Sequence, residues 1–201
     1  MASDTSFHDR PREGTASLLD ARLSNPREGG PSFSRAHRLL RLAWSIVWVL
    51  LARWTPTPLH GWRRFLLRCF GARIDRTARV YPSASIWYPP NLEMGRHAVM
   101  GPGVICYCMD RIRIGDYAIV SQRAHLCGGT QDPDDPHFQL QARPITIAAK
   151  AWIAADAFVG PGVTIGEGAI LGARGVAVKP IDPWTIHAGN PARKLRDRRR
   201  F

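Results

Sequence analysis

The sequence predicts an all-β fold, a left-handed parallel β-helix of about five coils, preceded by helices and a disordered tail. Three observations predict it. Beyond residue 73, aliphatic residues recur every six positions, and a small residue usually follows four places later. Turn formers are abundant, with 18 Gly and 16 Pro among 201 residues. A period of six fits neither an α-helix nor a simple strand, and it is the hexapeptide signature of a β-helix.

Each six-residue repeat places one aliphatic side chain inside a triangular prism, and three repeats complete one coil. The predicted inward positions are Ile74, Val80, Ile86, Leu92, Ala98, Val104, Ile114, Val120, Leu126, Ile147, Ile153, Val159, Ile165, Leu171 and Ala177. At about 4.8 Å per coil the prism is about 24 Å tall. Small residues such as Ala78 and Ala118 let the chain turn at a corner. Glycines directly after an inward position, such as Gly115 and Gly166, fit a corner that needs positive φ or close backbone approach.

The chain divides into four segments by composition and periodicity. They are a disordered tail (1–34), a basic and apolar helical cap (35–72), the β-helix (73–180) with a protruding loop (127–146), and a C-terminal cap with a basic tail (181–201). A long insertion in a regular repeat is usually functional, so we expect the loop to belong to the site.

Two helices are expected in the cap, at residues 35–54 and 60–70, because apolar residues recur at helical spacing and prolines 56 and 58 end the first. The uninterrupted apolar run, Leu42 to Ala52, is eleven residues, well short of the about 20 that span a membrane. Two interpretations stay open and are compatible. The helices cover one end of the prism, or they attach to the inner face of a membrane through arginines and aromatic rings.

The chain carries 28 Lys and Arg against 16 Asp and Glu, a net charge of +12 that would ordinarily suggest a polyanionic partner. The excess is uneven, with +6 in residues 42–79 and +5 in residues 193–201, whereas residues 80–192 sum to −1. Nucleic-acid readers place basic residues on the folded face that docks, so we predict no nucleic-acid partner. The N-terminus lacks an export signal and the four cysteines lack C-x-x-C spacing, so we expect a cytoplasmic protein with reduced thiols.

Seven motifs occur in order within residues 36–196. They are Ile86–Leu92, Asp110–Asp116, Ser121-Gln122 with Leu126-Cys127, Asp132–Phe138 on to Pro144-Ile145, Ala151–Ile153, Gly160–Val163 and Gly189–Ala192. In order and spacing they resemble the hexapeptide O-acetyltransferases, in particular the colanic acid and exopolysaccharide branch related to galactoside and nodulation-factor acetyltransferases. The resemblance implies acetyl transfer from acetyl-CoA to a hydroxyl of a sugar or lipid-linked saccharide, in surface polysaccharide biosynthesis, by a homotrimer without a metal.

Acetylating an alcohol requires a general base within hydrogen-bond reach of the hydroxyl. The resemblance gives this role to a His in the protruding loop, but Gln131 occupies that position here. A neutral amide accepts no proton, so three hypotheses stay open. A neighbouring imidazole is the base, either His137 in the loop or His125 at its root. Alternatively, Gln131 only positions the acceptor and the chemistry is slow, or the protein is a catalytically impaired β-helix that binds or scaffolds.

The resemblance also implies the other site residues. Asp132 would orient the base or the acceptor, although an Asp before Pro133 is equally a turn former. Cys108 and Asp110 would lie on the acceptor side. The residues that would line the pantetheine arm or meet the phosphates of acetyl-CoA are Trp152, Ala155, Ala173, Lys179 and Arg193. The two cations can neutralise phosphate charge, and each also suits an ordinary surface. No metal site is predicted, because the histidines lack the close pairing of a zinc site.

Overall fold

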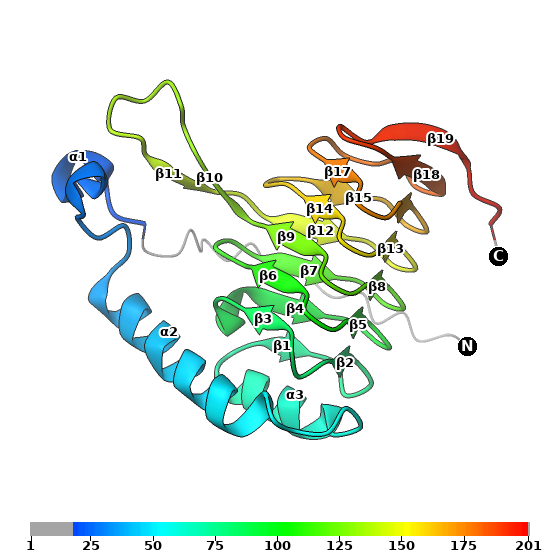
Figure 1. Cartoon of the computed structure of the whole chain (residues 1–201), viewed down its shortest axis with the longest axis horizontal. Helices are drawn as coiled ribbons and strands as arrows, with labels where there is room; N and C mark the ends of the chain where they lie inside the picture. The colour runs from blue at the N-terminus through cyan, green and yellow to red at the C-terminus, as the bar shows by residue number, and fades with distance from the viewer. Residues whose placement is uncertain (1–17, 201) are drawn as a thin grey trace, which may run out of the picture.

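A computed structural model describes residues 18–200, which form a parallel β-helix with helices over one end (Figure 1). Each coil contributes one short strand to each of three parallel sheets, which we call the first, second and third walls. Five complete coils are followed by a partial sixth, made by a bridge at Ile181 and by β18. The predicted β-helix is confirmed, with about six turns in place of five.

The strands are two to five residues long. The first wall holds β1 (Arg73–Ile74), β4 (Leu92–Met94), β7 (Ile112–Ile114), β12 (Ile145–Ile147) and β15 (Thr164–Ile165). The second wall holds β2 (Arg79–Val80), β5 (Val99–Met100), β8 (Ile119–Val120), β13 (Trp152–Ile153), β16 (Ile170–Leu171) and β18 (Thr185–Ala188), with β19 (Arg193–Asp197) antiparallel to β18. The third wall holds β3 (Ser85–Ile86), β6 (Ile105–Tyr107), β9 (His125–Cys127), β14 (Phe158–Val159) and β17 (Val176–Ala177).

The core is the inside of the prism, where one aliphatic side chain from each strand meets those of the other two walls. Ile147, Ile153 and Val159 make one such layer, and all three are fully buried. Burying an aliphatic side chain of this size contributes about 1.5–3 kcal/mol. Stacked layers of this kind therefore supply most of the stability of the β-helix.

Leu92, Ala98 and Val104 are fully buried in the core, as predicted, but they lie two residues before the positions that stack on Ile74, Val80 and Ile86. The strand residue that stacks on Ile74 and Ile114 is Met94, and Met100 and Cys106 continue the same register. The cause is coil length: each of the first two coils has 20 residues, Ile74 to Met94 and on to Ile114, whereas a later coil has 18. In the first coil the extra residues enter at the 3-10 turn η3 (Pro89–Asn91).

Close backbone approach, and not positive φ, explains the glycines that follow inward positions. A Cβ built on Gly166 would lie 2.5 Å from the backbone nitrogen of Pro183, and one on Gly115 would lie 2.7 Å from that of Ala149. Real Cβ atoms do not approach other atoms so closely, so only glycine fits between these successive coils.

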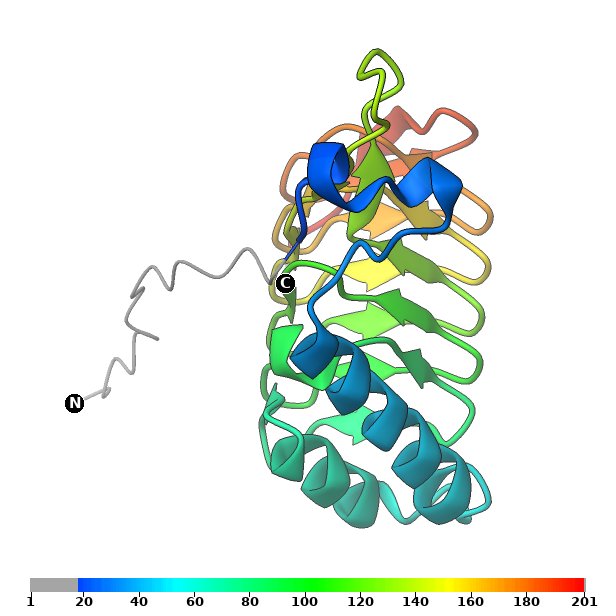
Figure 2. The same ribbon diagram turned by 90° about the vertical axis from the view of Figure 1, so that its left-hand side faces the viewer.

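The N-terminal helices lie against the first coil and along the third wall (Figures 1 and 2). They are α1 (Ala21–Ser24), η1 (Pro26–Glu28), α2 (Arg35–Val47), the π-helical turn η2 (Trp48–Ala52) and α3 (His60–Cys69). Trp44 is 1% exposed and donates from Nε1 to the Ile86 carbonyl (2.7 Å), and Trp48 donates to that of Ala84 (2.9 Å). The inner helix faces therefore cap the prism. No helix within residues 18–200 is long and apolar enough to cross a membrane.

The segment predicted as a disordered tail differs from that prediction over residues 18–34, while residues 1–17 lie outside the described residues. Leu18 bridges Phe33, and the Ala21 backbone nitrogen donates to Gln139 Oε1 (2.7 Å). These contacts hold the segment against the protruding loop, so tertiary partners supply the order that its composition does not predict. The loop is a hairpin of β10 (Gly129–Gln131) and β11 (Leu140–Ala142).

His37 gives the fold a specific response to acid. Its ring is 4% exposed and stacks between Phe33 and Tyr88, at 4.6 and 4.2 Å between ring centres. Burial, and secondarily the charge of Arg41, lowers the pKa of His37 from 6.5 to about 4. The contribution of the neutral, buried His37 ring to the free energy of unfolding is therefore complete above pH 6.5 and is lost as the pH falls toward 4. Between pH 7 and pH 5 we expect about 2 kcal/mol of unfolding free energy to be lost through this group.

Denaturant unfolding across that pH range measures the effect. The variant His37→Phe keeps an aromatic ring between the same neighbours and removes the titrating group. We expect its unfolding free energy to depend less steeply on pH between 7 and 5. An equal dependence in the variant and the parent would contradict the assignment.

Candidate functional site

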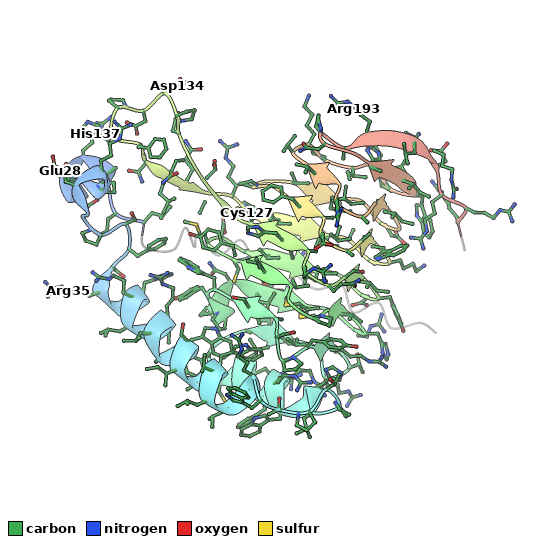
Figure 3. The ribbon with its side chains drawn as sticks, viewed as in Figure 1. Glu28, Arg35, Cys127, Asp134, His137 and Arg193 are labelled. Atoms are coloured by element: carbon green, nitrogen blue, oxygen red, sulfur yellow. The ribbon has the colours of Figure 1, made fainter. Side chains whose placement is uncertain are left out.

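The outward face of the third wall carries the strongest candidate site. Two columns of side chains run up it, because alternate strand residues point outward and successive coils are in register. One column contains Ser85, Ile105, His125, Phe158 and Val176, and the other contains Trp87, Tyr107 and Cys127. The hairpin leaves the prism directly after Cys127, so this wall forms the floor at the hairpin root (Figure 3).

His125 lies on this floor, in the strand that leads into the hairpin. Its ring is half-buried and meets Phe158 edge to face at 5.4 Å between ring centres. Burial lowers the pKa of His125 below its ordinary value of 6.5, because the apolar surroundings disfavour the charged imidazolium. The imidazole is therefore neutral at pH 7 and able to accept a proton.

The other predicted catalytic residues lie in the hairpin. Gln131 is exposed at the end of β10, and His137 is exposed near the hairpin's outer end, away from Cys127 at its root (Figure 3). Asp132 accepts from the Asp134 backbone nitrogen (3.0 Å) and from Gln141 Nε2 (3.2 Å). Asp132 thus closes the turn, as the alternative interpretation predicts, and no contact within the described chain links it to either histidine.

The two residues predicted on the acceptor side differ in accessibility. Cys108 is fully buried, and its Sγ lies 3.2–3.3 Å from the backbone oxygen and nitrogen of Tyr88. It supports the chain behind the third wall and does not reach the surface. Asp110 is half-buried and accepts from the Arg111 backbone nitrogen (2.6 Å), so it braces a corner.

The structure brings Lys179 and Arg193 together at the C-terminal end of the prism. Both line a cavity of about 220 Å³ whose other polar side chains are His187 and Lys194. Burial lowers the pKa of His187, and its Nε2 is buried without a hydrogen-bond partner in residues 18–200. Figure 3 shows Arg193 beyond Cys127, toward this end. Two lysines and an arginine around one cavity make it suitable for phosphate groups.

The remaining predicted cofactor residues lie on another part of the prism. Trp152 is 42% exposed on the second wall, with its Nε1 donating to Ser121 Oγ (2.9 Å). Ala155 and Ala173 stack on successive coils where the second wall turns into the third, because Ile153 pairs with Leu171. Lys179 follows the last strand of the third wall, whereas His187, Arg193 and Lys194 come from β18 and β19, so the cationic cavity lies where the second and third walls end.

Sequence reasoning missed His187 and Lys194, which only the return of the chain through β18 and β19 places beside Lys179. The sequence signal that could have found Lys194 is the basic cluster after residue 192. No group of three His, Cys, Asp or Glu side chains within the described range is arranged to hold a metal ion.

The described residues thus combine a prism of hexapeptide coils, a hairpin beside a half-buried imidazole, and a cationic cavity at one end. No protein-family model matches the chain. The chain is 41% identical over 159 residues to the protein named putative colanic acid biosynthesis acetyltransferase WcaF of Escherichia coli (strain K12), covering 79% of this chain and 87% of that protein. The chain belongs to this acetyltransferase family.

Solved structures share the fold. A hexapeptide-repeat acetyltransferase from Vibrio cholerae O1 biovar eltor, in complex with acetyl-CoA, has a TM-score of 0.73 and 22% identity, over 83% of this chain and 91% of that one. A galactoside acetyltransferase in complex with coenzyme A has a TM-score of 0.71 and 23% identity, over 85% and 88% of the two chains.

The environment of His125 predicts its titration. In the parent protein we expect the His125 ring to titrate below pH 6.5, because Phe158 and the wall exclude water from it. The variant Phe158→Ala opens one side of the ring to solvent and should raise this pKa toward 6.5. NMR titration of the imidazole carbon protons measures both values. Phe138→Ala, in the hairpin, is the matched control, and an equal shift in both variants would contradict the assignment.

Proposed function

We propose that the protein transfers the acetyl group of acetyl-CoA to a hydroxyl of a saccharide acceptor in surface polysaccharide biosynthesis. Family membership supports the reaction class, and the named role of the E. coli relative supports the pathway class. The observation that carries the proposal in this chain is the placement of His125. It lies on the third wall between the hairpin and the cationic cavity, where an acceptor and a thioester can meet.

His125 is the general base of the proposed reaction. The neutral imidazole accepts the proton of the acceptor hydroxyl while that oxygen attacks the thioester carbonyl. The tetrahedral intermediate collapses, the carbon–sulfur bond breaks, and the proton passes to the departing coenzyme A thiolate. Among the alternatives, the structure favours His125 over His137 because His125 lies on the floor of the site and His137 near the hairpin's outer end.

Lys179 and Arg193 bind the phosphates of acetyl-CoA in this proposal, with Lys194 beside them. The pantetheine arm then runs along the third wall toward His125, bordered by the corner of Ala155 and Ala173. Small side chains there permit close approach of the arm to the backbone.

A homotrimer is supported by the second wall. Its outward column, Val99, Ile119, Trp152, Ile170 and Ile186, is apolar over five coils. Ile119 and Trp152 are 44% and 42% exposed in the single chain. Packing walls against each other in a closed three-fold ring would bury this column.

Attachment to the cytoplasmic face of the membrane is supported by the outer face of the helical cap. Leu39, Leu42, Ile46, Leu50 and Trp54 form one exposed stripe along α2 and η2, at 50–81% exposure. Trp62 and Phe65 continue it on α3. Residues 35–72 contain no acidic residue, and four of their seven arginines are exposed: Arg35, Arg38, Arg53 and Arg68. An apolar stripe in a segment whose charged side chains are all cationic matches an anionic lipid surface, on which a lipid-linked acceptor would also lie.

Gln131 favours a second candidate function, a catalytically impaired protein that binds saccharide or supports a biosynthetic complex. It stands where the resemblance expects the base. Acetyl-transfer assays on two histidine variants separate this candidate from the first.

Thiol release from acetyl-CoA in the presence of sugars measures turnover. We expect His125→Ala to lower kcat about 10²- to 10⁴-fold, the usual effect of losing a general base. His137→Ala should change it less than about threefold, and His97→Ala, on an exposed corner, serves as a matched control. Unchanged turnover in His125→Ala would contradict the proposed base. Gln131→His should alter kcat by less than about tenfold, and a much larger gain would favour the impaired protein.

Vesicle sedimentation tests the membrane contact. The parent should pellet with phosphatidylglycerol-containing vesicles and much less with phosphatidylcholine alone. The double variant Leu42→Glu/Leu50→Glu should bind at least about tenfold more weakly, since two exposed apolar anchors become anions. Leu195→Glu, equally exposed at the other end of the prism, is the control. Equal pelleting of parent and double variant would refute this contact.

A further inference from the structure

Arg41, on α2, packs on aromatic rings and has no anionic partner within residues 18–200. Its Cζ lies 4.2 Å from the ring centre of Trp87 and 5.3 Å from that of Phe33, so the guanidinium stacks on aromatic rings. Its Nε is buried without a partner, and its guanidinium forms no hydrogen bond or ion pair within residues 18–200. A half-buried cation without an anion is costly, and burial disfavours its charged form.

Arg63 shows how the same cap treats a structural arginine. Arg63 is fully buried, yet its Nε donates to the Val80 carbonyl (2.7 Å) and its Nη1 to Thr55 Oγ1 (2.7 Å) and the Pro56 carbonyl (3.0 Å). Its guanidinium is thus tied to the chain on both sides. Arg41 is held on one face by stacking, and its two Nη groups, unlike the buried Nε, remain available for an incoming group.

The surroundings of Arg41 form a rigid platform. His37 stacks between Phe33 and Tyr88, and Trp87 meets Phe33, Tyr88 and Tyr107 at ring-centre distances of 5.1–6.3 Å. Interlocked rings fix the plane of the guanidinium before any ligand arrives. A planar donor set of this kind suits the two oxygens of a carboxylate or phosphate.

The position of Arg41 along the prism indicates which ligand carries the anion. Trp87, Tyr107 and Cys127 stand in one column, so Arg41 lies two coils, about 10 Å, from the hairpin root. The cationic cavity lies on the other side of that root, near the last coils. The two cationic sites therefore lie on opposite sides of His125 along the prism. Because the proposed function assigns the cavity to the coenzyme phosphates, Arg41 remains for an anionic group of the acceptor.

We propose that Arg41, stacked on Trp87, binds an anionic group of the acceptor saccharide and so selects an acidic sugar over a neutral one. The inference rests on the proposed function for its acceptor, and it adds a charge requirement. The anion is either a sugar carboxylate or a sugar phosphate. Both present paired oxygens to the guanidinium edge, and separate probes distinguish them.

NMR titration of the full-length protein with glucuronic acid, glucose 1-phosphate and glucose tests the proposal without requiring turnover. We expect at least one acidic sugar to bind roughly tenfold or more tightly than glucose, the usual effect of a charge-assisted pair. Arg41→Gln should abolish the preference, and Arg41→Lys should keep part of it because it keeps the charge but loses the planar fork. Arg38→Gln, an exposed arginine of the same helix, is the matched control and should retain the preference.

Equal affinity for all three sugars, or binding of none, would overturn the proposal. Equal loss of the acidic-sugar preference in Arg41→Gln and Arg38→Gln would also overturn the proposal, since such a result would indicate general electrostatic attraction. Dissociation of the oligomer in Arg41→Gln would overturn it as well, because it would show that a neighbouring copy, and not a sugar, pairs with the guanidinium. Normal thiol release with a neutral sugar alongside no acidic preference would overturn the charge requirement while leaving the proposed reaction intact.

Discussion

The in-register stacking of parallel coils is the constraint on which the rest of this structure depends. Once each inward aliphatic side chain lies above its counterpart, every outward residue is also placed in a column with a spacing of about 4.8 Å. The third wall thereby acquires a fixed order along one face. The Arg41–Trp87 cluster lies at one end, His125 and the hairpin root lie in the middle, and the cationic cavity lies at the other end. Distant segments of sequence become one surface through the repeat alone.

The positive charge of the chain is also distributed along the prism axis, at its two ends. The positive excess lies in the segments that flank the β-helix, and the fold gives those flanks separate surroundings. In the cap, exposed apolar side chains accompany the arginines, whereas Lys179, Arg193 and Lys194 gather around a cavity. The wall between them is nearly neutral, which suits a surface that handles hydroxyl groups and a thioester.

The six-residue repeat made the fold predictable, whereas the strand register could not be predicted where a coil departs from 18 residues. Ile147 and Ile165 follow a strict period, and both were placed in the correct stack. Leu92 was assigned the register that Met94 holds, because both side chains are buried on the same strand. Hydrophobicity cannot tell the two apart, whereas the strand pairing of Met94 with Ile74 and Ile114 does. The site was harder to predict. The family resemblance suggested Lys179 and Arg193, but Arg41 and Trp87 are 46 positions apart and meet only because α2 packs along the wall. Cys108 shows the converse, since a position matching a family motif is buried here.

We propose that acetyl transfer takes place on the third wall beside His125. A crystal structure of the protein with coenzyme A and a saccharide tests it most directly through the position of the coenzyme sulfur. We expect the phosphates at Lys179 and Arg193 and the sulfur beside the His125 ring, with the saccharide between that ring and the hairpin. A sulfur atom next to His137, or on the outward face of the second wall, would contradict transfer beside His125.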